Sequence, residues 1–212
     1  MKVILTGSTG MVGEGVLLAL LENPAVTEVL SVSRKPCGHT HPRLKEQIVP
    51  DFLKLTELPK GYDACFYCAG ISSVGLTEAE YTRITYDTVI HFAQLIADPS
   101  MTLVHISGAS TDGTEQGKTM WARVKGRAEN ALMKMPFKGV YNFRPAMMKP
   151  MPGQKYVNKY YPLVGWAYGL FHAFDKASTL RDVAQAMVNA ATGGYEKHVL
   201  EVPDINALAK RA

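Results

Sequence analysis

Residues 2–13 of the chain read Lys2-Val3-Ile4-Leu5-Thr6-Gly7-Ser8-Thr9-Gly10-Met11-Val12-Gly13. The apolar run of residues 2–6 predicts a short buried strand, and apolar residues at helical spacing follow from Val12 to Leu21. Three glycines at spacing G-x-x-G-x-x-G connect the two. A strand, a glycine-rich turn and a helix in this order are typical of a phosphate-binding turn, with a plain glycine turn as the alternative.

The turn suits a pyrophosphate for steric and electrostatic reasons. Gly7 permits the tight turn, Gly10 lets a phosphate approach the backbone, and Gly13 lets the helix pack close to the sheet. The helix N-terminus adds free N–H groups and the positive end of its dipole. We therefore expect a dinucleotide to bind at Gly7, Thr9, Gly10, Met11, Val12 and Gly13.

Strand and helix patterns alternate along the rest of the chain. Further strands are predicted at residues 28–33, 46–49, 63–68, 102–107, 139–144 and 198–202, and further helices at residues 77–97, 118–133 and 179–191. This alternation predicts an α/β fold with a doubly wound parallel sheet of the Rossmann type. With no internal repeat and no linker-like segment, residues 1–212 are predicted to form a single domain.

Composition limits the partners and the compartment. The net charge of +4 over 212 residues is too mild for the dense basic face of a nucleic-acid-binding protein. No apolar segment reaches the ~20 residues of a membrane span. Three cysteines are too few for a disulfide framework, which favours a reducing, cytoplasmic compartment. We expect neither a nucleic acid nor a membrane as partner.

Two short motifs resemble metal ligands but favour structural roles. Cys65 and Cys68 lie in an apolar run, and residues three apart in a strand point to opposite faces, so they are expected to pack in the core. His39 and His41 have no third ligand nearby and are expected in a solvated loop. No metal site is predicted.

The end of the second predicted strand distinguishes NADP(H) from NAD(H). An NAD site places Asp or Glu there to hold the ribose hydroxyls. This chain instead reads Ser33-Arg34-Lys35. These residues suit a 2′-phosphate, because a guanidinium such as that of Arg34 pairs with phosphate and stacks on adenine. NADP(H) is therefore predicted over NAD(H), with a solvated basic loop as the alternative.

Two further turns complete the predicted cofactor site. Asp51 and Phe52 follow the third strand, where an Asp commonly meets the adenine amino group in such folds. The fourth strand ends in Cys68-Ala69-Gly70, a turn of small residues against which a ribose can lie. We expect Asp51, Phe52, Ala69 and Gly70 to contact the cofactor.

Together these motifs resemble the short-chain dehydrogenase/reductase superfamily, in particular its short atypical members of the NAD(P)-dependent epimerase/dehydratase type. The resemblance covers roughly residues 1–150 and includes the helix Trp121-Ala122-Arg123-Val124-Lys125-Gly126-Arg127-Ala128-Glu129 and the strand end Phe143-Arg144-Pro145-Ala146. Such proteins carry Y-x-x-x-K-G-x-x-E and F-R-P-G there. The resemblance implies hydride transfer at C4 of the nicotinamide. A Tyr acts as acid and base, a Lys lowers its pKa and holds the ribose, and a Ser polarises the substrate oxygen.

Within this resemblance, Lys125 matches the family Lys, and an i,i+4 pair with Glu129 is a further role for it. Trp121 stands at the Tyr position. An indole N–H donates a hydrogen bond but does not titrate usefully, so Trp121 can orient a carbonyl or stack on nicotinamide, or simply pack, but cannot be the acid/base. The place of the second serine holds Gly108, which leaves Ser107 as the candidate, with a turn role as its alternative.

Other departures and replacements lie nearby. Ser110 is a second candidate for the missing serine, and the family Asn on the helix after the fourth strand is absent. Tyr81 and Tyr86 on that helix are candidates to replace the phenol.

The sequence thus predicts an NADP(H)-binding oxidoreductase or epimerase-like protein that acts on a small carbonyl or hydroxyl substrate, with Lys125, Ser107 and Trp121 at the reaction site. The alternative is a catalytically degenerate NADP(H)-binding sensor. Residues 145–176 are predicted to form a substrate-side lid, or a packed tail helix, with these aromatic residues: Tyr156, Tyr160, Tyr161, Trp166 and Phe171. Residues 77–97 and 118–133 offer a homodimer face, as in related proteins.

Overall fold

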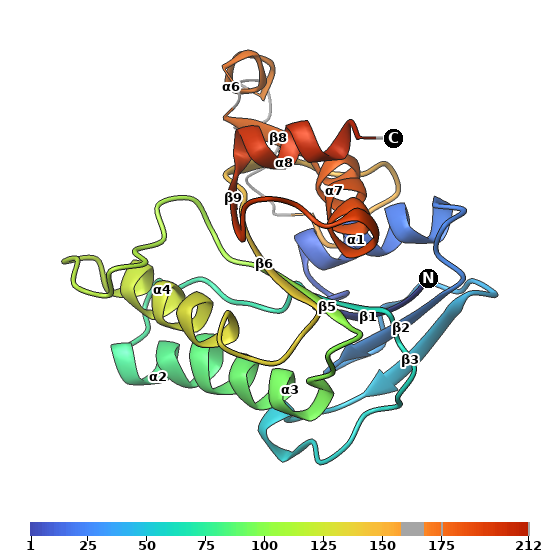
Figure 1. Ribbon diagram of the computed structural model, residues 1–212, viewed down its shortest axis with the longest axis horizontal. Helices are drawn as coiled ribbons and strands as arrows, with labels where there is room; N and C mark the ends of the chain where they lie inside the picture. The colour runs from blue at the N-terminus through green and yellow to red at the C-terminus, as the bar shows by residue number, and fades with distance from the viewer. Residues whose placement is uncertain (158–167, 175, 212) are drawn as a thin grey trace.

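A parallel seven-stranded sheet forms the centre of the computed structural model, which describes residues 1–157, 168–174 and 176–211 (Figure 1). Its strands are β1 (Lys2–Thr6), β2 (Glu28–Ser33), β3 (Leu44–Ile48), β4 (Ala64–Tyr67), β5 (Thr102–Ile106), β6 (Gly139–Arg144) and β9 (Val199–Glu201). Their order in space is β3-β2-β1-β4-β5-β6-β9. The chain therefore winds from β1 to one edge, returns beside β1 and winds to the other, and the order reverses between β1 and β4.

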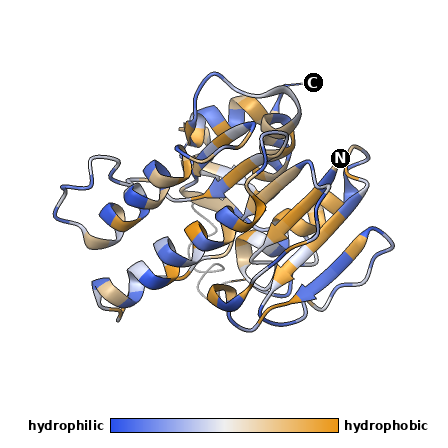
Figure 2. Ribbon diagram, turned by 60° about the horizontal axis from the view of Figure 1, so that its bottom comes forward, coloured by the Kyte–Doolittle hydropathy of each residue, from blue (hydrophilic) through white to orange (hydrophobic). Residues whose placement is uncertain are grey.

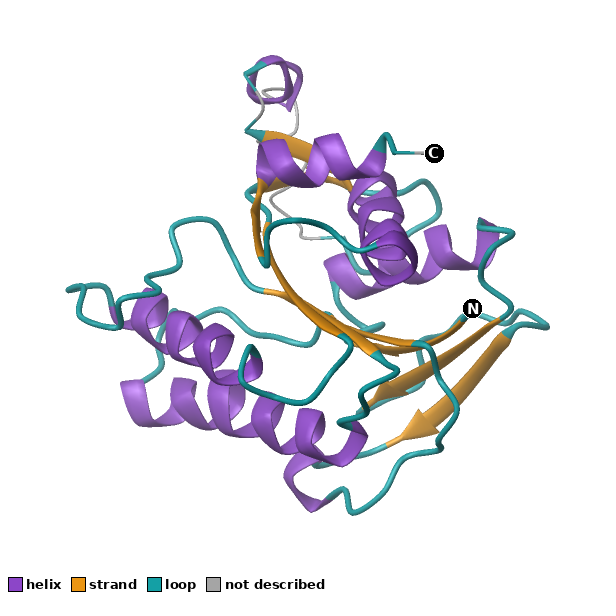
Figure 3. Cartoon of the chain, in the orientation of Figure 1, coloured by secondary structure: helices purple, strands orange, loops and turns teal. Residues whose placement is uncertain are grey.

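Helices cover both faces of the sheet (Figure 3). α1 (Met11–Glu22), α7 (Leu180–Gly193) and α8 (Val202–Ala209) lie on one face, and α2 (Glu78–Thr82), α3 (Thr88–Ile96) and α4 (Met120–Leu132) lie on the other. Successive residues of β1 enter the two separate cores, with Val3 and Leu5 on the α1 side and Ile4 on the α3 side. Figure 2 shows that the central strands are apolar, as expected for a sheet that is covered by helices on both faces. The predicted doubly wound Rossmann-type fold is confirmed.

One predicted helix contains an irregularity that its sequence pattern does not show. Residues 77–97 form a capped helix that begins after Thr77, but a π-helical turn, η2 (Arg83–Asp87), separates α2 from α3. The carbonyl of Arg83 accepts hydrogen bonds from both the backbone N–H and the Oγ1 of Thr88, the latter at 2.9 Å. The bonding therefore spans five residues instead of four.

Short elements near the C-terminal part were not predicted. β7 (Met147–Lys149) and β8 (Ala177–Thr179) form a separate two-stranded parallel sheet, and α6 (Tyr168–Ala173) lies between them in the chain. A strand of three residues is too short to show the alternation of apolar and polar residues that identifies a strand. The helix α8 was missed because it begins directly after β9, with no turn residues between them. The boundaries of the predicted elements otherwise agree with the structure within two residues.

The described part of the predicted lid is attached to α1. Glu14 is fully buried, and its carboxylate accepts the backbone N–H groups of Lys155 and Tyr156, both at 2.7 Å. His39 Nε2 lies 2.7 Å from the same carboxylate, so the expectation of a solvated His39 is wrong. Burial alone raises the pKa of Glu14, but the bonds from Lys155, Tyr156 and His39 outweigh it and hold this pKa below its usual value.

The structure describes two of the five aromatic residues that were predicted to line the lid. Tyr156 and Phe171 are exposed, and Tyr160, Tyr161 and Trp166 lie outside the described residues. In the described ranges, no helix combines the length and apolarity needed to cross a membrane.

Candidate functional site

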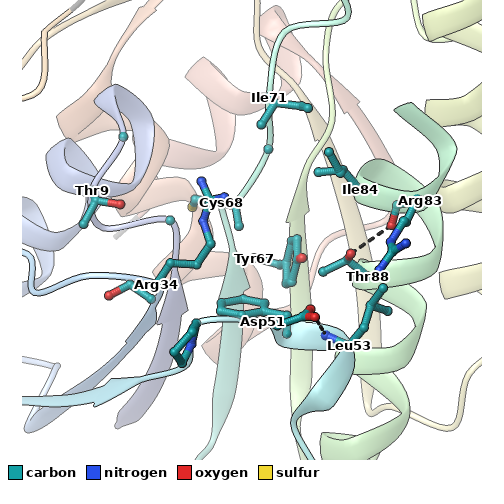
Figure 4. Close-up of a pocket in the computed structure, with 17 residues that line it drawn as sticks. Thr9, Arg34, Asp51, Leu53, Tyr67, Cys68, Ile71, Arg83, Ile84 and Thr88 are labelled. Carbon is teal, nitrogen blue, oxygen red and sulfur yellow. Dashed lines mark hydrogen bonds between the residues drawn. The ribbon is translucent and has the colours of Figure 1, made fainter. Parts of the chain in front are cut away.

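A cavity of about 300 Å³ opens at the carboxyl ends of β1, β2 and β4 (Figure 4). Nine residues of the predicted cofactor site line it: Gly7, Thr9, Gly10, Ser33, Arg34, Asp51, Phe52, Ala69 and Gly70. The cavity lies where the strand order reverses, which is where open α/β sheets bind their ligands. Five predicted residues do not line it: Met11, Val12, Gly13, Lys35 and Lys125.

The glycine turn has the geometry of a phosphate cradle. Gly7 has φ +75°, and a Cβ there would lie 2.7 Å from the backbone nitrogen of Ala69. A Cβ on Gly13 would lie 2.1 Å from the Gly7 carbonyl oxygen, so this glycine is required for packing. Gly10 is different, because the nearest atom to its Cβ would be 3.5 Å away. No side chain caps α1 at Gly10, so the free backbone N–H groups and the open space fit a phosphate.

Local hydrogen bonds hold the neighbouring strand ends in place. Thr6 Oγ1 accepts the N–H groups of Cys68 and Ala69, both at 3.1 Å, and so joins the turn after β4 to β1. Ser33 Oγ donates to the Lys35 carbonyl at 2.6 Å and turns the chain after β2. Between them, Arg34 is exposed and lines the cavity, as Figure 4 shows. Lys35 is also exposed but does not line the cavity.

The turn after β3 contributes one acid and one aromatic ring. Asp51 Oδ1 accepts the N–H of Leu53 at 3.1 Å and caps a short 3-10 turn, η1 (Phe52–Lys54). Phe52 lines the cavity and also stacks on Phe92, with ring centroids 5.5 Å apart. Asp51 is the sole carboxylate among the described residues that line the cavity.

Lys125, predicted to hold the ribose, lies at the turn after β5. Its Nζ donates to the Ser107 carbonyl at 3.0 Å, and burial lowers the pKa of Lys125. Ser107 is itself buried, and its Oγ lies 3.1 Å from Thr111 Oγ1. Ser107 Oγ thus bonds within the turn and the Ser107 carbonyl accepts from Lys125, while the catalytic role of Ser107 stays a prediction. Neither residue lines the cavity at β1, β2 and β4.

Glu129 makes its ion pair with Arg144, not with Lys125. Its carboxylate binds the Arg144 guanidinium through two bonds of 3.0 and 2.6 Å, and Glu129 is 1% exposed. Arg144 also reaches Glu201 at 3.2 Å. This cluster joins α4, β6 and β9, and it links the Glu of the K-G-x-x-E stretch to the Arg of the F-R-P stretch in this chain.

The three aromatic candidates for the missing phenol have different surroundings. Trp121 is half-buried in the first turn of α4, one turn before Lys125. Tyr81 is 2% exposed, and burial raises its pKa. The ring of Tyr86 is covered by the Arg127 guanidinium at 4.2 Å from its centroid. Both tyrosines are thus used in packing, and neither lines the cavity.

His105, on β5, is a buried titratable residue close enough to Lys125 to sense its charge, and the sequence reasoning did not single it out. It is 3% exposed, its Nδ1 lies 3.0 Å from Asn142 Oδ1, and its ring lies 6.1 Å from that of Tyr67. Burial, together with the charge of Lys125, lowers the pKa of His105 to about 4, so the ring is neutral at neutral pH. A lone His within an apolar strand carries no motif by which it could be recognised.

The match to the NAD dependent epimerase/dehydratase family covers residues 3–119, more than half of the chain. The chain belongs to this family, and the resemblance stated from its motifs is confirmed. A curated relative, "Protein fmp52, mitochondrial" from Emericella nidulans, is 24% identical over 164 residues. The alignment covers 69% of this chain and 66% of the relative, so the chain spans slightly less than two thirds of that protein.

Solved structures with the same fold include two epimerases. UDP-glucuronic acid 4-epimerase from Bacillus cereus, in complex with NAD, superposes with a TM-score of 0.66 at 16% identity, over 95% of this chain and 76% of that one. ADP-L-glycero-D-manno-heptose-6-epimerase from Helicobacter pylori gives a TM-score of 0.67 at 16% identity, over 99% and 80%. At this identity the likeness concerns the fold.

Proposed function

We propose that this protein binds NADP(H) in the cavity and is an oxidoreductase or epimerase-like enzyme for a small carbonyl or hydroxyl compound. Membership of the family supports a nicotinamide dinucleotide in general. The choice of NADP(H) rests on one observation. At the end of β2, where an NAD site needs a carboxylate, the exposed Arg34 side chain lines the cavity instead.

Different residues around the cavity bind different parts of the proposed cofactor. The N–H groups that follow Gly10 in the first turn of α1 bind the pyrophosphate, and Arg34 binds the 2′-phosphate. Asp51 accepts from the adenine amino group, and the turn at Ala69 and Gly70 lies against a ribose. When bound, the nicotinamide supplies a C4 position that accepts or donates hydride.

The proton must come from a group other than the usual phenol. Trp121 Nε1 can donate a hydrogen bond that orients a substrate oxygen, but it cannot release its proton. Lys125 lies one helical turn after Trp121 on α4. Its Nζ gives up a proton more readily than the amine of an exposed lysine, because burial lowers its pKa. We propose that Lys125 holds the ribose and that Lys125 or a water at Nζ provides the proton.

A nicotinamide fluorescence titration tests the cofactor assignment. The native chain should bind NADPH at least about tenfold more tightly than NADH, since a charge-assisted bond to phosphate is lost with NADH. Arg34→Gln should weaken NADPH binding about tenfold and leave NADH binding unchanged. Tighter binding of NADH than of NADPH by the native chain would contradict the assignment.

A screen of carbonyl substrates with NADPH tests the activity. The native chain and Trp121→Tyr are compared, with Trp121→Phe as the control that restores no hydroxyl. Turnover by the native chain supports an enzyme. Turnover by Trp121→Tyr alone would reject it in favour of the NADP(H)-binding sensor.

The compartment and the assembly remain predictions of the proposal. Cys37, Cys65 and Cys68 are free thiols, in keeping with a reducing, cytoplasmic location. A homodimer through α2, α3 and α4 would appear as a doubled mass in light scattering. A fluorescent fusion of the full-length protein tests the location.

A further inference from the structure

A second arginine faces the cavity from the helical side. Arg83 and Arg34 lie on opposite sides of the cavity, with Tyr67 between them (Figure 4). Both arginines are exposed, and neither belongs to an ion pair among the described residues. Other surface arginines do form such pairs, for example Arg181 with Glu22 at 2.6 Å.

The π-helical turn η2 brings this arginine to the cavity. In a regular α-helix, residues five apart point in clearly different directions. The wider turn closes the Arg83 carbonyl onto Thr88, and Arg83, Ile84 and Thr88 all line the cavity. Single π-turns inside α-helices often occur at functional sites. Here the irregularity has an identifiable consequence, which is a guanidinium on the cavity wall.

The charges around the cavity favour a strongly anionic ligand. The lining residues include two positive charges, those of Arg34 and Arg83, and one negative charge, that of Asp51. The Asp51 carboxylate already accepts a hydrogen bond from Leu53. Burial raises the pKa values of Tyr67 and Cys68, so both side chains are neutral at neutral pH. The N-terminus of α1, on the Arg34 side of the cavity in Figure 4, is already assigned to the pyrophosphate. The two arginines therefore point to a second phosphate on the adenosine side.

We propose that Arg83 is a specificity-determining residue, which holds the 2′-phosphate of NADP(H) together with Arg34. The inference rests on the proposed function, because it places a second cation at the same cofactor. The two guanidinium groups approach the phosphate from opposite walls, one from the end of β2 and one from η2. Each supplies charge-assisted hydrogen bonds to oxygens that NAD(H) lacks.

Calorimetric titrations of four variants test this assignment. The variants are Arg83→Gln, Arg83→Lys, Arg34→Gln and, as a control that removes the same charge on the opposite face of the sheet, Arg181→Gln. The ligands are NADPH and NADH, and adenosine 2′,5′-bisphosphate and adenosine 5′-monophosphate, which differ only by the 2′-phosphate. Arg83→Gln should weaken NADPH and the bisphosphate about tenfold and leave NADH and the monophosphate unchanged.

The two accompanying variants sharpen this expectation. Arg83→Lys should fall between the native chain and Arg83→Gln, because it keeps the charge but not the planar fork. Arg181→Gln should behave as the native chain does with all four ligands.

The possible failures separate the two levels of the proposal. If Arg83→Gln weakens NADH and NADPH equally, Arg83 contacts the adenine or the pyrophosphate, and the assignment is overturned. It is also overturned if NADPH binds Arg83→Gln as tightly as the native chain, while Arg34→Gln still loses the preference; the proposed function then stands. If the native chain binds neither dinucleotide, the proposed function fails and this inference fails with it. Thermal unfolding of each variant confirms that the exposed substitutions leave the fold intact.

Discussion

The turn after β1 and the turn after β5 lie at the same edge of the sheet, but they are built in different ways. The first is made of backbone, with Gly7 at φ +75° and Gly13 packed against the Gly7 carbonyl. The second is held by side chains, because Lys125 on α4 donates to the Ser107 carbonyl and Ser107 Oγ lies 3.1 Å from Thr111 Oγ1. Beneath it, His105 on β5 contacts Asn142 on β6. The first keeps every feature of a phosphate-binding turn, and the second has Trp121 and Gly108 in place of the family's Tyr and Ser.

This difference shows which parts of such a site can change. A backbone cradle depends on the absence of Cβ atoms, so almost any substitution at its packed glycines prevents folding. A side-chain cluster can exchange its chemistry while the fold survives, provided that its buried charges stay paired. The cluster beneath the turn after β5 consists of His105, Asn142, Glu129 and Arg144. We expect large stability effects in the turn after β1, intermediate effects in this cluster, and small effects at the surface of the turn after β5.

The largest effect should come from Gly13→Ala. A Cβ at 2.1 Å from the Gly7 oxygen forces α1 away from the sheet, and the loss approaches the whole stability of a domain, about 5 kcal/mol or more. Gly10→Ala is the matched control, because its Cβ would meet nothing closer than 3.5 Å. It should fold normally but bind the dinucleotide more weakly. Equal urea midpoints for the two variants would break the comparison.

The next largest effect concerns the ion pair between Glu129 and Arg144. Glu129→Gln removes the charge of a buried carboxylate and leaves the partly buried Arg144 guanidinium without its bidentate partner, so it should lower the free energy of unfolding by about 3 kcal/mol. Glu201→Gln removes the exposed partner of the same arginine and should cost about 1 kcal/mol or less. Chemical denaturation of both variants checks this. A similar loss for both would mean that burial does not set the cost.

The sheet was predictable because each central strand is a short apolar run that ends at a turn of glycine or proline. The cofactor turn was predictable because all its glycines lie within seven consecutive residues, 7–13. The cluster beneath the turn after β5 was not. His105 and Asn142 are 37 residues apart, and Glu129 and Arg144 are 15 apart, so only the register of β5 with β6 and the packing of α4 bring them together. The π-turn was hidden because the apolar pattern on either side of it remains helical.

An intermediate effect is expected from the protonation of His105. Its pKa in the folded state is about 4, against an ordinary value of 6.5, so the unfolded chain binds the extra proton first as the pH falls. The stabilisation is complete above about pH 6.5 and is lost as the pH falls toward 4. Between pH 7 and pH 5 the free energy of unfolding should fall by about 2 kcal/mol, and in His105→Gln this part of the loss should disappear.

A second variant separates this effect from that of Glu14. The pKa of Glu14 is held below its ordinary value of 4.5, so its contribution is present above that pH and is lost only as the pH falls below it. Glu14→Gln should therefore leave the slope between pH 7 and 5 unchanged. Urea titrations at several pH values distinguish the two. A native slope that persists in His105→Gln would show that another group carries it.

The smallest effect on stability is expected at Gly108, where the family has its second serine. A Cβ there would lie 3.8 Å from Lys125 Nζ, an ordinary contact, and Gly108 does not adopt a positive φ. Gly108→Ala and Gly108→Ser should both fold with changes within about 0.5 kcal/mol. Only the serine places a hydroxyl beside Lys125. The rate of NADPH-dependent turnover should therefore be higher in the double variant Gly108→Ser/Trp121→Tyr than in Gly108→Ala/Trp121→Tyr. Equal turnover would mean that this turn cannot regain the family's chemistry by side-chain exchange alone, and the contrast with the backbone-built turn after β1 would lose its basis.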